Sequence, residues 1–461
     1  MADTGTESDR DWQAGIEDRL LRVAAALAEG DDAALEADLR DLPAPDRADL
    51  IARLNPEARR TLAIRRPATI DGPVLVDLSG PLVRELGRLL PVDHLVEAMS
   101  GLDADDVLYV FDELDPDAQI ATLARLPVAS RLAVQTGLSF PEESAGRLMQ
   151  RRLVAVPNYW TAGRVLDWLS QARELPDRFT EVFIVDPRWH PVGVLPLDRL
   201  VRCDRETAIE TLMDADSHPV PATMDQEEVA FLVQRYHLLA VPVVDDAGRL
   251  IGRISVEDIG EVIEEEVEED AMRLAGLRED DLDHGILPTA RARLVWLVVN
   301  LGTALLASSV IRAFEDSIEV LVALAVLMPI VASLGGNAAT QTLTVAVRAL
   351  ATRELTRANA WRMIGKEAAV GILNGVVLAI LVGLMAWVWF GNIGLGGVIA
   401  AAMIINLFVA ALVGIIVPIT LARLKIDPAI ASSVFVTTAT DVVGFMAFLG
   451  LATWLLLGGL V

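Results

Sequence analysis

The sequence is poor in cysteine, histidine and basic residues, and these shortages exclude several classes of protein. A single cysteine, Cys203, leaves no internal disulfide and no thiolate zinc site. The five histidines lack the spacing of zinc ligands. The 39 Lys and Arg residues are outnumbered by 65 Asp and Glu, which gives a net charge of −26. Such a surface repels nucleic acid and attracts cations.

The signatures of enzymes are also missing. The sequence has no nucleophile–base pair, no P-loop and no dinucleotide fingerprint, so we predict no enzymatic activity. The N-terminus is polar and acidic and lacks the apolar core of a signal peptide. The soluble part is therefore expected to stay in the cytoplasm.

The excess of acid lies in the first part of the chain. From residue 284 onward there are ten basic and seven acidic residues, which leaves 29 basic and 58 acidic residues before it. Residues 1–140 form an acidic, helical N-domain, since apolar residues recur every three or four positions between breaks such as Gly30 and Pro43. A stack of helical hairpins, superhelical or bundled, is typical of this pattern.

Residues 141–256 alternate between strands and helices and contain an internal repeat. The paired segments are Leu148-Met149 and Leu212-Met213, helices over 161–173 and 225–237, and strands over 181–186 and 240–245. The repeat resembles a tandem pair of CBS modules, which often bind adenine nucleotides. Ser255 and Asp258 of the second copy fit the pattern with which such modules hold a ribose. They predict one ATP-type site, with a scaffold that binds no nucleotide as the alternative.

Residues 257–283 begin with an acidic helical stretch that contains Glu264-Glu265-Glu266 and a thin apolar stripe. This stretch connects the repeats to the apolar part of the chain. It is therefore placed to transmit a signal between them.

Residues 284–461 contain five apolar segments, each long enough to cross a lipid bilayer. They cover residues 293–312, 318–341, 367–390, 397–421 and 428–457. Basic loops alternate with loops that carry no basic excess. This pattern predicts a multi-pass protein of the inner or plasma membrane, with its soluble domains in the cytoplasm and its C-terminus outside.

Two of these segments carry unusual polar groups. The second segment contains Gly335-Gly336-Asn337, which predicts non-helical backbone that lines a wet cavity, with Asn337 facing an ion. Close helix packing through small residues is the alternative. In the fifth segment Ser433, Thr437 and Asp441 fall on one helical face.

A carboxylate such as Asp441 costs roughly 2.5–3.5 kcal/mol inside hydrocarbon, so it indicates water, a partner or a cation nearby. Magnesium takes oxygen ligands and holds its waters tightly, and it suits one carboxylate per subunit surrounded by hydroxyl groups. The alternative for the hydroxyl groups is hydrogen bonding within their own helix.

At this point the chain resembles the MgtE family of magnesium channels over residues 15–461. The order of an acidic helical N-domain, two CBS modules, an acidic plug helix and five membrane helices matches. So do Gly335-Gly336-Asn337 with Gln341, the segment 348–353, Asp427-Pro428-Ala429, and Thr440-Asp441-Val442-Val443-Gly444.

The resemblance implies a homodimer with a pore on its two-fold axis, where Asp441 binds hydrated Mg²⁺ and Asn337 lines the pore. It also implies that cytosolic Mg²⁺ bridges acids of several domains and closes the pore. By motif, these acids are Asp258, Glu261, Glu266, Glu269 and Asp270 of the plug helix, Asp427 at the inner membrane surface, Glu227 of the second CBS module and Asp93 of the N-domain.

The sequence thus predicts a magnesium-selective uptake channel with negative feedback from the cytosol. A membrane-tethered sensor of adenine nucleotides is one alternative, but it leaves Asp441 unexplained. A carrier or exporter of divalent cations is another, because sequence does not separate a channel from a carrier.

Overall fold

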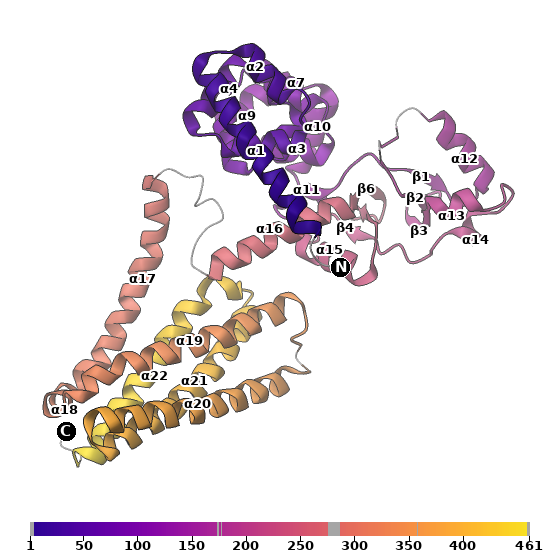
Figure 1. Cartoon of the computed structure of the whole chain (residues 1–461). Coiled ribbons are helices and arrows are strands. Elements are labelled where there is room, and N and C mark those ends of the chain that lie inside the picture. The colour runs from indigo at the N-terminus through magenta and orange to yellow at the C-terminus, as the bar shows by residue number, and fades with distance from the viewer. Residues whose placement is uncertain (1–3, 173–174, 177, 275–285, 357, 459–461) are drawn as a thin grey trace. The chain divides into compact units, whose positions relative to one another are not determined.

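The computed structural model describes residues 4–172, 175–176, 178–274, 286–356 and 358–458. The chain forms two compact units, Met1–Glu265 and Glu266–Val461, drawn in indigo to magenta and in orange to yellow in Figure 1. The helix α16 (Val256–Leu274) continues across the boundary between them.

The first unit begins with a series of short helices. They are α1 (Thr4–Glu29), α2 (Asp32–Leu39), α3 (Ala44–Arg53), α4 (Pro56–Arg65), the 3-10 turn η1 (Pro67–Thr69), α5 (Gly72–Val76), α6 (Gly80–Gly87), α7 (Val92–Ser100), α8 (Ala104–Glu113), α9 (Pro116–Arg125) and α10 (Val128–Gly137). Several start at proline, whose missing N–H costs nothing in the first turn, and Asn55 caps α4 by accepting the Ala58 N–H.

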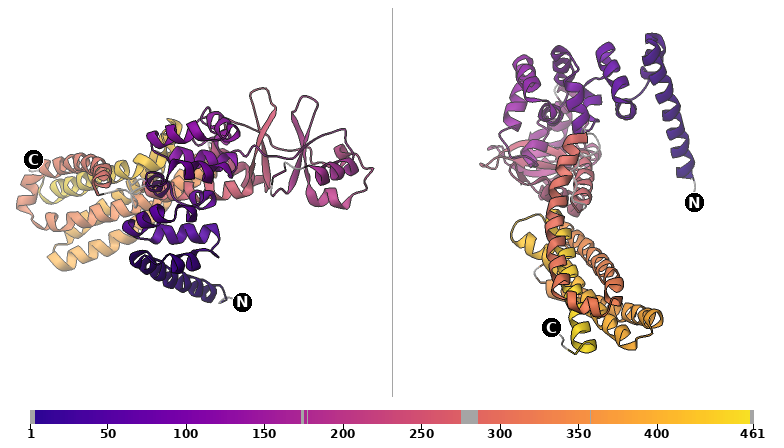
Figure 2. Two further views of the ribbon diagram at one scale, coloured as in Figure 1. Left: turned by 90° about the horizontal axis from the view of Figure 1, so that it is seen from above. Right: turned by 90° about the vertical axis from the view of Figure 1, so that its left-hand side faces the viewer.

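These helices form a superhelical stack. This is one of the two arrangements, superhelical or bundled, that the sequence predicts. α3, α5, α7 and α9 follow one another in one row, and α6, α8 and α10 form another. Figure 2 shows the helices lying side by side. The leucines between the rows, such as Leu75, Leu86 and Leu95, are fully buried and form one continuous core.

The sequence repeat folds into two sheets of the same topology. The first has β1 (Ala155–Pro157), β2 (Glu181–Val185) and β3 (Pro191–Pro196), and the second has β4 (Val220–Pro221), β5 (Ala240–Val244) and β6 (Leu250–Ser255). In each sheet the first strand runs parallel to the second, and the second runs antiparallel to the third. The helices are α11 (Ala145–Leu148), α12 (Ala162–Gln171), α13 (Leu197–Arg202), α14 (Ile209–Leu212) and α15 (Gln226–Tyr236).

The two copies exchange their leading segments. Ala145 and Met149 pack into the core of the second copy, and Met213 packs against the core of the first. Gly252 and Gly193 make this exchange possible. A Cβ at Gly252 would lie 2.6 Å from the Met149 sulfur, and a Cβ at Gly193 would lie 2.7 Å from the Met213 sulfur. The repeat therefore works as one intertwined pair rather than as two separate modules.

The second unit is a helical membrane domain. Its helices are α17 (Ile286–Ala313), α18 (Glu315–Val320), α19 (Ala323–Ala351), α20 (Ala360–Phe390), α21 (Ile393–Arg423) and α22 (Pro428–Leu456). Among the described residues, five of them, α17 and α19 to α22, are long and apolar enough to cross a membrane, which confirms the predicted number. α21 packs against α19, α20 and α22 and is therefore the central helix of the unit.

Candidate ion pathway and cation-sensing acids

Asp441 lies near the middle of α22, one turn after Thr437. Its side chain is half-buried, and within the described part of the chain its carboxylate meets no cation and no hydrogen-bond donor. The Thr437 hydroxyl donates to the Val434 carbonyl at 3.3 Å, which is a bond within its own helix. An apolar helix thus presents one carboxylate without a compensating group.

The segment Gly336-Asn337 of α19 lies beside this part of α22. A Cβ at Gly336 would lie 3.6 Å from the Thr437 Cγ2, and the side chain of Asn337 is exposed on the single chain. The structure therefore brings together the two segments that the sequence singled out. The side chain of Ser433, the third predicted pore residue of α22, lies outside the described residues.

The predicted break in α19 is wrong. The helix is continuous through Gly335-Gly336-Asn337, so its carbonyl groups are engaged within the helix and do not line a cavity. Gly335 is buried, and a Cβ there would lie 2.2 Å from the Asn406 Nδ2. Close packing, the alternative interpretation, accounts for this glycine.

Two polar side chains in the membrane unit escaped the sequence interpretation. Asn406 of α21 is fully buried and donates to the Val331 carbonyl of α19 at 2.9 Å. Glu367 of α20 is also buried, and its Oε2 accepts a hydrogen bond from the Thr342 hydroxyl at 3.4 Å. The position of Asn406 inside an apolar segment was the available signal for that residue, whereas Glu367 follows Lys366 at the edge of its segment.

Two predicted metal-binding acids of the second unit converge on one arginine. Arg273, near the end of α16, pairs with Glu269 one turn earlier. Its other guanidinium nitrogen donates to the Asp427 Oδ2 at 2.8 Å. Glu269 and Asp427 therefore share a positive charge, which is supplied by the chain itself.

In the first unit, acids of α8 approach the start of α16. Burial, together with the charges of Asp106 and Asp258, raises the pKa of Asp105 to about 8. Burial and neighbouring acids likewise raise the pKa of Asp106 to about 6. Burial also raises the pKa of Asp258 and of Glu261. The structure thus places two predicted sensor acids beside two N-domain acids that the sequence did not indicate.

The remaining predicted acids lie elsewhere. Asp93 is exposed and forms an ion pair of 2.6 Å with Arg125. Glu227 is exposed in the first turn of α15, and Glu266 is half-buried in α16. The side chain of Asp270 lies outside the described residues. Among the residues described, no three acidic, histidine or cysteine side chains are arranged to hold a metal ion.

Comparison with known proteins gives a family for this arrangement. A model of a divalent cation transporter, MgtE, matches residues 328–451, the MgtE intracellular N domain matches residues 42–143, and a CBS domain matches residues 209–265. The magnesium transporter MgtE of Bacillus subtilis is 31% identical over 440 residues, which cover 94% of this chain and 96% of the relative. This chain belongs to the MgtE family.

The MgtE of Thermus thermophilus is 33% identical over 463 residues, with 96% of this chain and 99% of the relative covered. A crystal structure of the cytosolic domain of the Mg²⁺ channel MgtE in complex with ATP is 30% identical, covers 53% of this chain and 99% of that chain, and has a TM-score of 0.48. The MgtE transporter model spans most of α19 to α22 and thus Asn337, Asn406 and Asp441. MgtE proteins are transporters, not a family of enzymes.

Of the two predicted nucleotide residues of this MgtE-family chain, Ser255 lines a pocket of about 220 Å³ together with Glu257 and Arg253, whereas Asp258 is not part of its lining. Asp103 of the N-domain lies at the same pocket. Asp258 is turned toward the protein, because its Oδ2 accepts the Ser255 N–H at 2.7 Å and its Oδ1 accepts from the Gln150 side chain at 3.0 Å.

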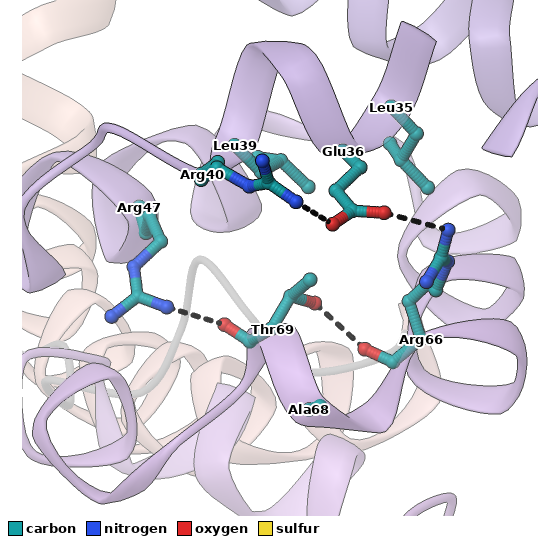
Figure 3. A pocket seen from close by; sticks show the side chains of 8 residues that line it. All are labelled: Leu35, Glu36, Leu39, Arg40, Arg47, Arg66, Ala68 and Thr69. Carbon is teal, nitrogen blue, oxygen red and sulfur yellow. Dashed lines mark hydrogen bonds and ion pairs between the residues drawn. The ribbon is translucent and has the colours of Figure 1, made fainter. Parts of the chain in front are cut away.

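A second pocket, of about 180 Å³, lies in the N-domain and is lined by three arginines (Figure 3). Arg40 and Arg66 both reach Glu36, and Arg47 donates to the Thr69 carbonyl at 3.3 Å. Glu36 therefore supplies the negative charge for Arg40 and Arg66, and Arg47 pairs with Asp71 at 2.8 Å, so the pocket is a set of internal ion pairs.

Proposed function

We propose that this MgtE-family chain is a magnesium-selective channel that admits Mg²⁺ to the cytosol. The observation that carries the proposal is Asp441, a carboxylate in a membrane-spanning helix with no cation or donor against it within the described residues. A passing cation would compensate its charge. Relatives that are 31% and 33% identical over nearly the whole chain are magnesium transporters, which favours Mg²⁺ among the divalent cations.

The permeating species in this proposal is the hydrated ion. Mg²⁺ gives up its waters reluctantly and is commonly held by one or two carboxylates through them. Two copies of the chain, joined as a homodimer with α22 at the two-fold axis, would provide two Asp441 carboxylates on one path. Asn337 and Thr437 would supply an amide and a hydroxyl group that hydrogen-bond to the waters of the ion.

The loops support an orientation with the soluble unit in the cytosol. Arg291 and Arg293 lie near the start of α17, Arg348 lies in the last turn of α19 with Arg353 just after it, and Arg423 is the last residue of α21. The positive-inside rule puts these loops on the cytoplasmic side and the C-terminus outside.

Cytosolic Mg²⁺ closes the channel in this proposal. The charge of Asp258 contributes to the raised pKa of both Asp105 and Asp106, and the charge of Glu261 contributes to that of Asp106, so these acids repel one another when ionised. A divalent cation between them would remove the repulsion and stabilise the compact state, as required for a ligand that shifts a conformational equilibrium. Glu266, Asp270, Glu227 and Asp93 are further candidate ligands.

ATP binding is a second, separate proposal, and the pocket of about 220 Å³ beside Ser255 favours it. Ser255 would hold the ribose together with Asp258, provided that Asp258 releases its present hydrogen bonds. As an alternative function, a nucleotide sensor anchored in the membrane would bind ATP but would show no ion flux.

Flux into liposomes tests the proposal. The purified full-length protein should let Mg²⁺ reach an internal Mg²⁺-sensitive dye, and Asp441→Ala should lower the flux by roughly a hundredfold, since it removes about 3 kcal/mol of compensation for the ion. Asp316→Ala, which removes an exposed acid from the short helix α18 between the first two spanning helices, is the matched control and should conduct normally. Equal flux through wild type and Asp441→Ala would overturn the proposal.

A further inference from the structure

Asn406 is a buried amide at the junction of three membrane helices. It belongs to α21, it is 0% exposed, and its Nδ2 donates to the Val331 carbonyl of α19 at 2.9 Å. Its Oδ1 is also buried and has no hydrogen-bond partner among the described residues. An unsatisfied amide oxygen is costly in hydrocarbon, whereas a leucine of similar size would avoid that cost. Packing alone therefore does not explain an asparagine at this position.

Two glycines make room for the amide. A Cβ at Gly335 of α19 would lie 2.2 Å from the Asn406 Nδ2, and a Cβ at Gly444 of α22 would lie 2.8 Å from the same atom. Both distances are shorter than a carbon–nitrogen contact allows. The amide therefore rests directly on the backbone of both neighbouring helices, and no side chain separates them from it.

Both glycines adjoin the proposed ion pathway. Gly335 comes two residues before Asn337, and Gly444 comes three residues after Asp441. Each is therefore within about one helical turn of a pore residue. The Asn406 side chain is fully buried, so it acts behind the pathway and does not meet the ion.

We propose that Asn406 is a positioning residue for permeation. Its amide holds α19 and α22 at the separation at which Asn337 and Asp441 can receive a hydrated divalent cation. The Val331 carbonyl fixes the orientation of the amide, since rotation would set two oxygen atoms against each other. The inference rests on the proposed function, because it concerns the same pathway.

The test compares Asn406→Leu with wild type as full-length protein in liposomes. Mg²⁺ flux should fall by roughly tenfold or more, because small displacements of positioned groups have effects of that size. The ratio of Mg²⁺ to Co²⁺ flux should also fall, while thermal unfolding in detergent stays close to wild type. Asn374→Leu is the matched control, because Asn374 is an asparagine of α20 that is exposed rather than buried. It should leave the flux and the ratio unchanged.

A second set of variants separates the hydrogen bond from the packing. Gly335→Ala should clash with the amide, and Asn406→Ala should leave a hole. The double variant places a methyl group where the amide was, so it should recover thermal stability. We expect it not to recover the Mg²⁺ to Co²⁺ ratio. Recovery of both properties would overturn the role of the amide, and this result decides the question even if Asn406→Leu does not fold.

Asp441→Ala, measured in the same liposomes, keeps the two proposals apart. A wild-type protein without Mg²⁺ flux would overturn the proposed function. A wild-type flux that Asp441→Ala abolishes and Asn406→Leu leaves intact, in both rate and ion ratio, would overturn only the inference about Asn406.

Discussion

Asp441 and Asp105 are partly buried carboxylates, and among the described residues neither has a positive charge to compensate it. Asp441 has no compensating group among the described residues of the membrane unit. Asp105 has a buried Oδ1 without a hydrogen-bond partner in the described chain, and its neighbours Asp106 and Asp258 carry the same charge. Retaining such groups weakens the fold. Both carboxylates are therefore suited to bind a metal cation from solution in place of a positively charged side chain.

The stability of the folded chain depends on pH through Asp105. Its pKa is about 8 in the folded chain against an ordinary value of 3.8, so the folded state binds the proton more tightly between these values. Stability must then fall as the pH rises from about 4 to about 8, by up to about 1.4 kcal/mol per pH unit. Asp105→Asn should flatten this slope when the apparent Tm of the full-length protein is followed from pH 5 to 9 in EDTA.

The exposed Asp117→Asn serves as the control and should retain the slope of wild type. Added Mg²⁺ at pH 8 should raise the Tm of wild type more than that of Asp105→Asn, because metal binding competes with the proton for a carboxylate. A slope that Asp105→Asn does not change would show that other acids govern the pH response.

The contrast between these residues shows what sequence can predict at this scale. Asp441 stood out because a charge in an apolar segment is rare. Asn406 carries no charge, and its role depends on Gly335 and Gly444, which only the fold brings to it from two other helices. The sequence indicated Asp93 as the N-domain acid, but only the packing of α8 identifies Asp105 as a buried neighbour of Asp258.

At the scale of elements, the sequence predicted those features that depend on neighbouring residues along the chain. The apolar length of each segment gave the number of spanning helices, and alternating strands and helices gave the paired sheets. The exchange of Met149 and Met213 between the two repeats was not predictable, because both copies present equivalent cores. The continuity of α19 was missed because paired glycines fit a break and a close contact equally well.

α16 offers a prediction that belongs to an element. Its Arg273 pairs with Glu269 and Asp427, so Mg²⁺ must displace a guanidinium group to bind between those two carboxylates. Arg273→Gln removes this competitor. Cytosolic Mg²⁺ should then inhibit the channel at a concentration lower by about tenfold, equivalent to about 1.4 kcal/mol. Flux into liposomes at graded Mg²⁺ on the cytosolic side measures the change.

Arg362→Gln removes the same charge from an exposed position on α20 and should leave the inhibitory concentration where it is in wild type. If Arg273→Gln behaves like this control, then Glu269 and Asp427 do not take part in sensing.

At the scale of the whole chain, the N-domain is attached to the CBS pair through charged contacts. Arg147 pairs with Asp112, and Arg152 lies 3.7 Å from Asp103. The same face of the N-domain presents Asp105 and Asp106 to the start of α16. Attraction from arginines and repulsion between acids thus oppose each other at one interface. A divalent cation that binds the acids removes their repulsion and leaves the attraction of the arginines, so it strengthens the interface.

Removal of residues 1–140 tests this balance directly. The truncated chain loses Asp105 and Asp106 but keeps the spanning helices, so it should conduct at Mg²⁺ concentrations that silence the intact protein. We expect the half-inhibitory concentration to rise by about tenfold or more, which is more than about 1.4 kcal/mol of lost coupling. Asp441→Ala within the truncated chain should lower the flux by roughly a hundredfold, as in the full-length protein, and so exclude a leak through damaged protein. Inhibition at the same Mg²⁺ concentration in both lengths would place the sensor outside the N-domain.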